Sequence, residues 1–372
     1  MHLLLVTPFL PPRIGGIERH SENLIREFVK SPGSEITVLT SNNPRWPVQE
    51  RNYPRNVKII QLRSVTLFGR LPIPLVTLSN FRKLRELRKR NFDRLIVQSH
   101  LFPISTISAL IMQKVPSKIW INHGSGYITM GRNIVQTVEK FYENLQARIM
   151  SRRMNGFIAV SKDAATWISS IVKQNFACVP NGVPAELIVQ RQTFPVIKGQ
   201  ISLLFVSRLL PGKGGIEAIK ILEKLIEREA GEGAYSLTVI GEGSEEEEMQ
   251  AYATSKQLPV IFLGALNHDV VIEQMRKCDV FIYPSKYPEG FPTVILEAIA
   301  SGLLIASTSP AGLEVFIETA SCIYGQESEL ASLLSHILMK PIQIINMIQS
   351  TQVLLRVNYT WDSIVKELTN PR

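Results

Sequence analysis

Short apolar runs alternate with longer helix-like stretches along the whole of this 372-residue chain. Parallel strands need long crossover connections, which are usually helices, so this alternation predicts parallel sheets covered by helices on both faces. Ligands of such sheets bind at the carboxyl ends of the strands, and we expect a site there. The strands are expected at 3–7, 35–40, 57–62, 95–98, 118–122 and 156–161, and again at 201–206, 237–240, 260–263, 280–283 and 303–306.

The pattern stops once and restarts, which predicts two domains. Residues 184–199 have little periodicity, and the length of the chain suits two domains of ordinary size. We expect an N-terminal domain over residues 1–185 and a C-terminal domain over residues 200–355. Residues 356–372 should form a final segment whose helix begins at Tyr359-Thr360-Trp361-Asp362.

The charge is unevenly divided between the two halves. Residues 1–190 carry 26 basic and 11 acidic side chains, whereas residues 191–372 carry 15 and 21. A basic half of net charge +15 predicts an anionic partner for the first domain. Basic side chains interleaved with aromatic ones are missing, as is any nucleic-acid motif, so an anionic membrane surface or a phosphate-bearing acceptor is favoured over nucleic acid.

The sequence favours a cytoplasmic location. No basic leader precedes the first strand, and Cys178, Cys278 and Cys322 are scattered without a Cys-x-x-Cys spacing. Such cysteines are typical of reduced structural thiols. The charge-free stretch 95–113 contains Gln98, His100 and Pro103, so it reads as a strand followed by a helix and not as a membrane span.

The segment P-E-G-F-P-T-V-I-L-E-A-I-A-S-G, from Pro288 to Gly302, places two carboxylates on a strand-to-helix connection. Glu289 falls in the loop, and Glu297 lies about two helical turns further on. Free N–H groups at a helix start attract phosphate, while ionised carboxylates accept hydrogen bonds from sugar hydroxyls. One ligand with both phosphate and sugar satisfies both features. The alternative is a helix-capping acid followed by a solvated glutamate.

A second segment, V-S-R-L-L-P-G-K-G-G, carries Arg208 and Lys213 on a glycine-rich connection after a strand. Arginine offers a rigid two-pronged contact to phosphate and lysine a mobile point charge, so together they suit a diphosphate. Two solvated surface cations are the alternative. Near the N-terminus, Gly15 and Gly16 open a helix after the first strand, where an ordinary glycine turn is the alternative to a ligand contact. His123 ends another strand beside glycines.

These segments resemble the motifs of the retaining glycosyltransferases of family 4, which have the GT-B fold. The resemblance covers nearly the whole chain and is most specific over residues 206–215 and 280–302. Two positions depart from the usual pattern, because Ser207 and Pro292 stand where the family usually has glycine. The resemblance implies two Rossmann-like domains with parallel sheets facing a central cleft, and a C-terminal helix that crosses back to the N-terminal domain.

The resemblance also implies roles for individual residues. The first glutamate would contact sugar hydroxyls, the second the ribose, and the arginine and lysine the diphosphate, while His123 would line the reaction centre. Catalytic candidates are therefore His123, Glu289, Arg208 and Lys213. Donor-binding candidates are Gly15, Gly16, Arg208, Lys213, Gly264, Ala265, Glu289, Gly290, Phe291, Pro292, Thr293 and Glu297.

The implied activity is transfer of a hexosyl group, with retention, from a UDP- or GDP-sugar to a hydroxyl of a lipid-linked acceptor or growing glycan. Alternatives are a catalytically silent nucleotide-sugar-binding scaffold and a nucleotide-sugar epimerase. No two of the five aspartates form Asp-x-Asp, the motif that binds a metal–diphosphate pair in the other large glycosyltransferase fold. Arg208 and Lys213 would do that job, so neither a metal nor another cofactor is expected.

A basic segment suggests where an anionic surface would bind. Residues 81–90, F-R-K-L-R-E-L-R-K-R, predict a basic helix with Phe81, Leu84 and Leu87 spaced for one face. Residues 65–76 before it predict an apolar loop that includes Phe68. Together they favour a peripheral contact with the inner face of the cell membrane. Alternatively the helix covers the sheet, the loop packs inward, and the acceptor is soluble.

Overall fold

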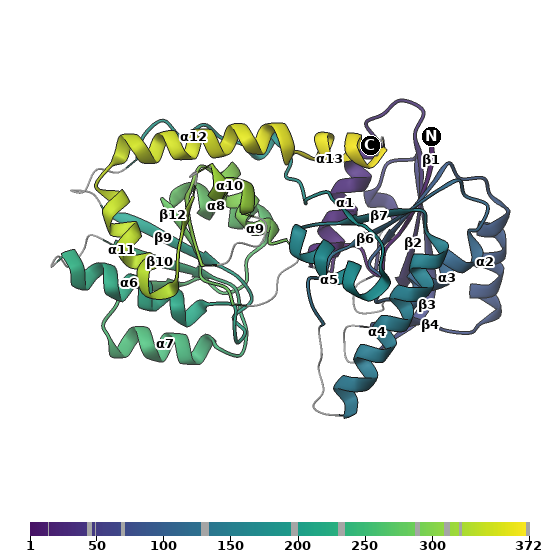
Figure 1. The fold of residues 1–372 in the computed structure, drawn as a ribbon, viewed down its shortest axis with the longest axis horizontal. Helices are drawn as coiled ribbons and strands as arrows, with labels where there is room; N and C mark the ends of the chain where they lie inside the picture. The colour runs from purple at the N-terminus through teal and green to yellow at the C-terminus, as the bar shows by residue number, and fades with distance from the viewer. Residues whose placement is uncertain are drawn as a thin grey trace. The chain divides into compact units, whose positions relative to one another are not determined.

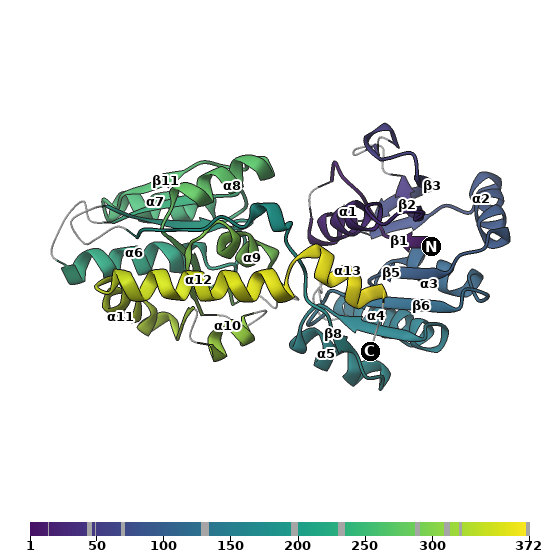
Figure 2. The same ribbon diagram turned by 90° about the horizontal axis from the view of Figure 1, so that it is seen from above.

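The chain forms two compact units, each built around one sheet (Figures 1 and 2). The first contains residues 1–181, Phe291 and residues 361–369, and the second contains residues 182–286 and 292–360. The computed structural model describes residues 1–13, 15–42, 47–48, 50–67, 71–127, 134–194, 200–229, 235–286, 291–308, 313–319 and 322–369.

The first unit contains a sheet whose strand order is β4-β3-β2-β1-β5-β6-β7-β8. All neighbouring strands are parallel except the pair β3 and β4. The strands are β1 (His2–Val6), β2 (Glu35–Asn42), β3 (Val57–Leu67), β4 (Leu71–Pro74), β5 (Arg94–Gln98), β6 (Ser117–Asn122), β7 (Gly156–Ala159) and β8 (Ala177–Cys178).

Helices cover both faces of this sheet. Successive residues of a strand point to opposite faces, so Leu3 and Leu5 of β1 join one buried cluster while Leu4 and Val6 join another. This is why the buried strands read as unbroken apolar runs. The helices of the unit are α1 (Gly16–Phe28), α2 (Leu78–Lys89), α3 (Pro103–Ile111), α4 (Ile134–Arg153), α5 (Lys162–Val172) and α13 (Trp361–Thr369), with the short helix η1 (Glu50–Asn52).

The C-terminal helix α13 belongs to the first unit. Its residues Trp361, Ile364, Val365 and Leu368 are buried in the cluster that contains Leu3 and Leu5. Arg94 at the start of β5 donates a hydrogen bond of 2.8 Å to the carbonyl oxygen of Thr369, which satisfies an end of the helix. The predicted return of the terminal helix to the N-terminal part of the chain is thereby confirmed.

The second unit contains an all-parallel sheet in the order β11-β10-β9-β12-β13-β14. Its strands are β9 (Ile201–Val206), β10 (Tyr235–Ile240), β11 (Val260–Phe262), β12 (Val280–Tyr283), β13 (Leu304–Ser307) and β14 (Ile323–Tyr324). The helices are η2 (Ala185–Leu187), α6 (Gly215–Glu229), α7 (Glu246–Ser255), α8 (His268–Lys277), α9 (Thr293–Ala300), α10 (Glu314–Glu318), α11 (Glu327–Leu338) and α12 (Pro341–Asn358).

The main difference from the predicted elements is a hairpin. Residues 65–76 were expected to form a loop, but 65–67 continue β3 and 71–74 form β4, which pairs with it in antiparallel register. Phe68 lies outside the described residues. The short strands β8 and β14 were also not predicted, since two residues carry no detectable alternation.

No single helix within the described ranges is long and apolar enough to cross a membrane. Helices α11 and α12 meet that criterion only when they are joined, and they bend by 109° where they meet. Leu330 and Leu334 of α11 and Ile344 and Ile348 of α12 are buried in the core of the second unit. The predicted interpretation of residues 95–113 is confirmed, because they form β5, a turn and α3.

Candidate active site

The order of the strands reverses beside β9 in the second sheet. β10 and β11 follow β9 on one side, while β12, β13 and β14 lie on the other. Connections from the two neighbouring strands then leave in opposite directions and open a crevice at their carboxyl ends, where ligands of such sheets bind. The loop after β9 carries Arg208 and Lys213, and the chain after β12 leads to α9, so both predicted motifs belong to this point of the sheet.

Close backbone packing shapes the loops at this edge. A Cβ atom on Gly241 would lie 1.8 Å from the carbonyl oxygen of Ser207, and one on Gly214 would lie 2.5 Å from that of Pro284. Both glycines have positive φ, 136° and 91°, a region that L-residues rarely adopt. The Lys286 N–H donates a hydrogen bond of 2.8 Å to the Gly212 carbonyl, which ties the loop after β9 to the end of β12.

Lys213 and Arg208 have different environments in this loop. Lys213 is only 5% exposed, whereas Arg208 is exposed at the end of the strand. The loop after β9 therefore carries one buried cation and one exposed cation.

Glu297 is held by a partner that the sequence analysis missed. Its side chain is buried on α9, and Nε2 of His268 lies 3.1 Å from its Oε1. His268 begins α8, directly after the turn at Gly264, whose carbonyl accepts a hydrogen bond of 2.8 Å from Gly241 N–H. The carboxylate of Glu297 is therefore held by a residue from the connection between β11 and α8. The only sign of this partner in the sequence is the histidine four residues after Gly264.

The start of α9 has no side-chain cap among the described residues. Pro292 is its N-cap residue and makes no side-chain capping bond, and Thr293 is the first helical residue. The first N–H groups of a helix have no partner within it and favour an anion. Phe291 packs against the apolar cluster of the first unit, and its carbonyl accepts a hydrogen bond of 3.2 Å from Asn181. Glu289 and Gly290 lie outside the described residues.

The first sheet reverses its order in the same way, between β1 and β5. Gly15 caps α1 in extended conformation, and its position is tightly enclosed: a Cβ there would lie 2.3 Å from Oε2 of Glu18. Glu18 is buried and pairs with Arg13 at 3.3 Å; burial raises the pKa of its carboxyl group, while Arg13 opposes that shift. Gly16 faces open space. A carboxylate of the protein thus already lies at this helix start.

His123 lies at the carboxyl end of β6, beside the same reversal point. Asn122 fixes the turn, because its amide donates a hydrogen bond of 2.8 Å to the Gly124 carbonyl. The His123 ring donates to Oε1 of Gln98 at the end of β5. Burial lowers the pKa of His123 to about 4, so the imidazole is neutral at pH 7.

Each sheet therefore gathers its own candidates at its carboxyl edge. Within the part of the chain that the structure describes, no three His, Cys, Asp or Glu side chains are grouped to bind a metal ion. The described candidates of the first unit are Gly15, Gly16, His123 and Phe291, and those of the second are Arg208, Lys213, Gly264, Ala265, Pro292, Thr293 and Glu297.

Two family profiles match consecutive parts of the chain. The family described as Glycosyltransferase Family 4 matches residues 14–187, and the one described as Glycosyl transferases group 1 matches residues 189–341. An uncharacterised glycosyltransferase of Methanocaldococcus jannaschii is 22% identical over 98% of this chain and 96% of its own length.

A mannosyltransferase of Corynebacterium glutamicum is 25% identical over 99% of this chain and 96% of its own length. Its full description is GDP-mannose-dependent monoacylated alpha-(1-6)-phosphatidylinositol monomannoside mannosyltransferase. Among solved structures, Anabaena HepE in complex with UDP and glucose has a TM-score of 0.71 at 15% identity, covering 99% of this chain and 98% of that one. The chain belongs to the family 4, group 1 glycosyltransferases, which are retaining enzymes of the GT-B fold that transfer a sugar from a nucleotide-sugar donor.

Proposed function

We propose that the second unit binds a UDP- or GDP-hexose and that the first unit binds the hydroxyl acceptor. The observation that carries the proposal is the loop after β9, which holds buried Lys213 and exposed Arg208 at the reversal point of the second sheet. These two cations are assigned to the diphosphate, and Glu297 to the ribose hydroxyls. The domains proposed from the sequence are 1–185 for the acceptor and 200–355 for the donor, with the terminal segment 356–372 returning to the former.

Other candidates complete the donor site in this proposal. The free N–H groups at Thr293 supply an anion contact, and the Gly264–Ala265 turn contacts the base with its backbone. Glu289, Gly290 and Phe291 orient the transferred sugar, and Gly15 and Gly16 border the diphosphate from the first unit. Pro292 sets the entry into α9, where its fixed φ suits the residue before a helix.

The proposed reaction occurs on one face of the sugar. The bond between the anomeric carbon and the diphosphate oxygen breaks, and the acceptor hydroxyl oxygen forms its bond to that carbon from the same side. The hydroxyl proton passes to the departing diphosphate. Negative charge grows on the diphosphate as the bond breaks, so preorganised cations at Arg208 and Lys213 lower the barrier. Neutral His123 is suited to a hydrogen bond with a sugar hydroxyl at pH 7.

Donor identity is tested by a thermal-shift panel of UDP-, GDP- and ADP-hexoses, because a ligand that binds only the folded state raises the melting temperature. We expect one nucleotide series to stabilise the wild type and to lose that effect in Arg208→Ala. Product analysis then separates the reaction classes. A silent binding protein would leave the donor intact, and an epimerase would convert it without any acceptor.

The acceptor is proposed to be lipid-linked, and the supporting surface is the hairpin–α2 patch. We define this patch by six exposed apolar residues, Val65, Leu67, Leu75, Val76, Leu78 and Phe81, and five cations of α2, Arg82, Lys83, Arg85, Arg88 and Lys89. Leu78, Phe81, Arg82, Arg85 and Lys89 share one helix face by their spacing. An apolar edge beside a basic face suits the headgroup region of an anionic bilayer.

The spacing predicted Phe81, Leu84 and Leu87 on one face, but the structure separates them. Leu87 is fully buried and Leu84 packs against the same core, whereas Phe81 is exposed. The exposed apolar residues come instead from the hairpin and the first turn of the helix. The Corynebacterium relative is named for a phosphatidylinositol-based acceptor, which supports a lipid-linked acceptor here. In this proposal the enzyme works in the cytoplasm, against the inner face of the cell membrane.

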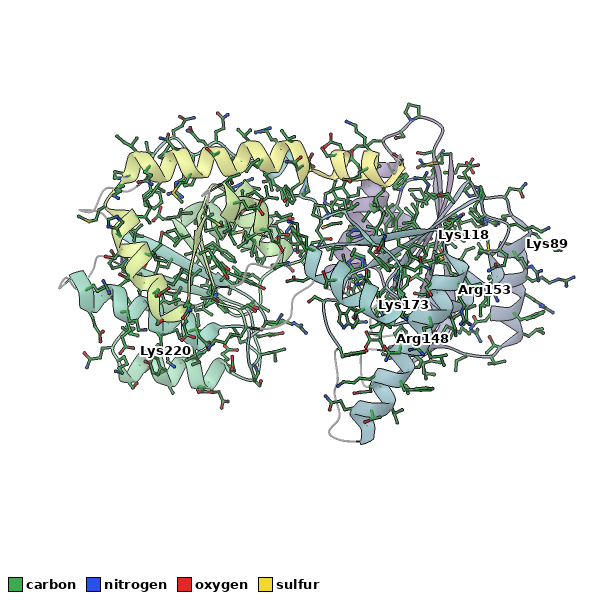
Figure 3. The ribbon with its side chains drawn as sticks, in the orientation of Figure 1. Lys89, Lys118, Arg148, Arg153, Lys173 and Lys220 are labelled. Atoms are coloured by element: carbon green, nitrogen blue, oxygen red, sulfur yellow. The ribbon has the colours of Figure 1, made fainter. Side chains whose placement is uncertain are left out.

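Liposome co-sedimentation tests the membrane contact. Binding should increase with the fraction of anionic lipid and decrease with salt, since exposed charges are screened beyond about 10 Å at 0.1 M ionic strength. The triple change Arg85→Glu, Arg88→Glu and Lys89→Glu should abolish it. The matched control is Lys220→Glu, Lys224→Glu and Arg228→Glu on exposed positions of α6, which alters net charge equally. Lys220 is labelled in Figure 3. Equal losses in both triples, or a supernatant protein at low salt, would favour a soluble acceptor.

A further inference from the structure

Three side chains of the first unit are linked by hydrogen bonds across three elements. His20 comes from α1, Gln98 from the end of β5, and His123 from the end of β6. Nε2 of Gln98 lies 3.1 Å from Nδ1 of His20, and Oε1 of the same amide bonds Nε2 of His123. The two imidazole rings also meet edge to face, with centroids 4.8 Å apart.

The amide group determines which nitrogen of each ring carries the proton. The NH₂ of Gln98 only donates, so Nδ1 of His20 accepts and its proton is on Nε2. The amide oxygen only accepts, so His123 donates from Nε2 and keeps a lone pair on Nδ1. Among the described residues, Gln98 is the hydrogen-bond partner of the His123 ring.

Both rings are neutral in this arrangement. Burial lowers the pKa of His20 well below its usual value, with the neighbouring His123 ring as a second cause, and burial lowers the pKa of His123 to about 4. Between the rings Gln98 is an uncharged amide, and the uncharged Trp361 ring of α13 meets His20 edge to face at 5.0 Å. Within the described residues, the ionisable group against His123 is His20.

The backbone beside Gln98 is strained in a way that serves this placement. Ser99 has a φ of 65°, which is uncommon for a residue with a side chain, and its N–H donates 2.8 Å to the Ile121 carbonyl on β6. The turn brings the end of β5 against β6, next to the residue that precedes His123 by two positions. Gln98 itself is fully buried, so its amide has no water to compete for its hydrogen bonds.

We infer that Gln98, oriented by His20, is a positioning residue that holds His123 in its Nε2–H form so that Nδ1 accepts a hydrogen bond from a hydroxyl of the transferred sugar. The inference rests on the proposed function for the placement of His123 against the sugar. A neutral histidine free to exchange tautomers would spend part of its time with Nδ1 protonated, and then it could not accept that bond. The hydrogen bond from His123 to Gln98 excludes the tautomer that is protonated on Nδ1. It does so without placing a charge beside the leaving diphosphate.

The tautomer is measured on the wild-type protein alone. Long-range ¹H–¹⁵N correlation of the histidine rings at pH 7 should show His123 with a protonated Nε2 and an unprotonated Nδ1, and His20 likewise. His123→Gln and His20→Asn variants assign the signals. A His123 ring that is charged at pH 7, or protonated on Nδ1, would overturn the inference whether or not any donor has been identified.

Kinetics of two Gln98 variants supply the functional test. In Gln98→Glu the carboxylate accepts from both rings and favours their charged forms, so kcat/KM should fall about ten- to a hundredfold at pH 6 and recover toward pH 9. In Gln98→Leu the loss should be similar and should not recover with pH. A pH-independent loss in Gln98→Glu, or full activity in Gln98→Leu, contradicts a positioning role.

Failure of the inference is distinguishable from failure of the proposed function. If the wild type shows the expected tautomers but transfers no sugar from any donor in the panel, the proposed function is wrong. If it transfers sugar but its activity is indifferent to Gln98, the positioning role is wrong. Melting temperatures of both variants identify any loss that comes from unfolding, and the wild-type spectrum remains decisive if a variant does not fold.

Discussion

At the residue scale, the buried Lys213 and the exposed Arg208 are expected to contribute differently to stability and alike to transfer. Both would stabilise charge on the leaving diphosphate, and removal of one such electrostatic contact typically costs about a hundredfold to a thousandfold in kcat. Of the two side chains, only that of Lys213 is packed inside the protein. The choice of substitution can therefore separate the effect on stability from the effect on transfer.

We predict that Arg208→Ala and Lys213→Met each lower kcat by about a hundredfold or more, since each removes one charge from the diphosphate contact. Melting temperature should stay within a few degrees in Arg208→Ala because Arg208 is exposed. It should fall less in Lys213→Met than in Lys213→Ala, because methionine retains most of the lysine stem. Lys213→Ala adds a cavity and should also lower the melting temperature. Normal turnover by the Arg208→Ala, Lys213→Met double variant would exclude both residues from the site.

The pair of His268 and Glu297 leads to a prediction about the ribose. His268 holds one oxygen of the carboxylate at 3.1 Å, and the proposed donor site assigns this carboxylate to the ribose hydroxyls. His268→Ala should weaken binding of the preferred nucleoside diphosphate about tenfold, the typical cost of losing a hydrogen bond to a charged group. Isothermal titration with the 2′,3′-dideoxy analogue is the control. That analogue should bind wild type and variant equally, and a tenfold loss for both ligands would mean that His268 acts elsewhere.

At the element scale, the connections at the carboxyl edge of the second sheet depend on glycine for two separate reasons. Gly212 has a φ of 84° but open space around its Cβ position, whereas Gly241 has a φ of 136° and the Ser207 carbonyl at 1.8 Å from that position. The first position has only a conformational requirement. The second has a steric one as well, and the atom in its way is backbone that cannot rotate aside.

This difference gives a matched pair of variants in one unit. Gly212→Ala should cost about 1–2 kcal/mol of unfolding free energy, the usual cost of a left-handed conformation for an L-residue. Gly241→Ala should cost clearly more, because its methyl group must displace the end of β9. Urea unfolding followed by circular dichroism compares them. Equal costs would mean that the loop after β9 relaxes freely, so that the close backbone packing beside Ser207 does not constrain it.

The elements best predicted from sequence are the central strands. Val97 and Phe281 lie in strands buried on both faces, so their neighbours form unbroken apolar runs that no other element imitates. β4 escaped prediction because Pro72 and Pro74 read as loop residues. They are tolerated there because an edge strand does not need all of its N–H donors.

The residues of the candidate site also differ in how well the sequence predicts them. Arg208, Lys213 and Glu297 stand in local motifs, so the sequence could point to them. His268 is 29 residues from Glu297, and His20 is 78 residues from Gln98, so their pairing exists only after the sheets form. Neither residue stands in a pattern of its own. Partners of this kind are determined by tertiary structure, and single-sequence reasoning has no physical access to them.

At the scale of the whole molecule, each of the two units repeats one arrangement. Each sheet reverses its strand order once, and candidate residues gather at the carboxyl ends beside that reversal. The two edges differ in what they offer a ligand. The first supplies a neutral histidine and a helix start already covered by Glu18, and the second supplies cations and a helix start without a side-chain cap.

We predict that transfer survives chelation. Arg208 and Lys213 together carry two positive charges, which is the charge that a divalent cation would bring to the diphosphate. EDTA at a concentration well above that of trace metals should leave most of the rate intact in wild type. Abolition by EDTA with recovery on adding magnesium or manganese would overturn this assignment. The measurement is the initial rate before and after chelation, with the donor and acceptor concentrations unchanged.

The place of α13 in the first unit has a consequence for biosynthesis. Trp361, Ile364 and Leu368 fill a face of the sheet whose strands are made from the beginning of the chain. During translation part of the apolar surface of that sheet therefore stays uncovered until residues 361–369 have left the ribosome. The second unit, made later, has no such dependence on the final helix. A polypeptide that stops before Trp361 would thus be defective in its earliest part, and protein quality control would meet that exposed face first.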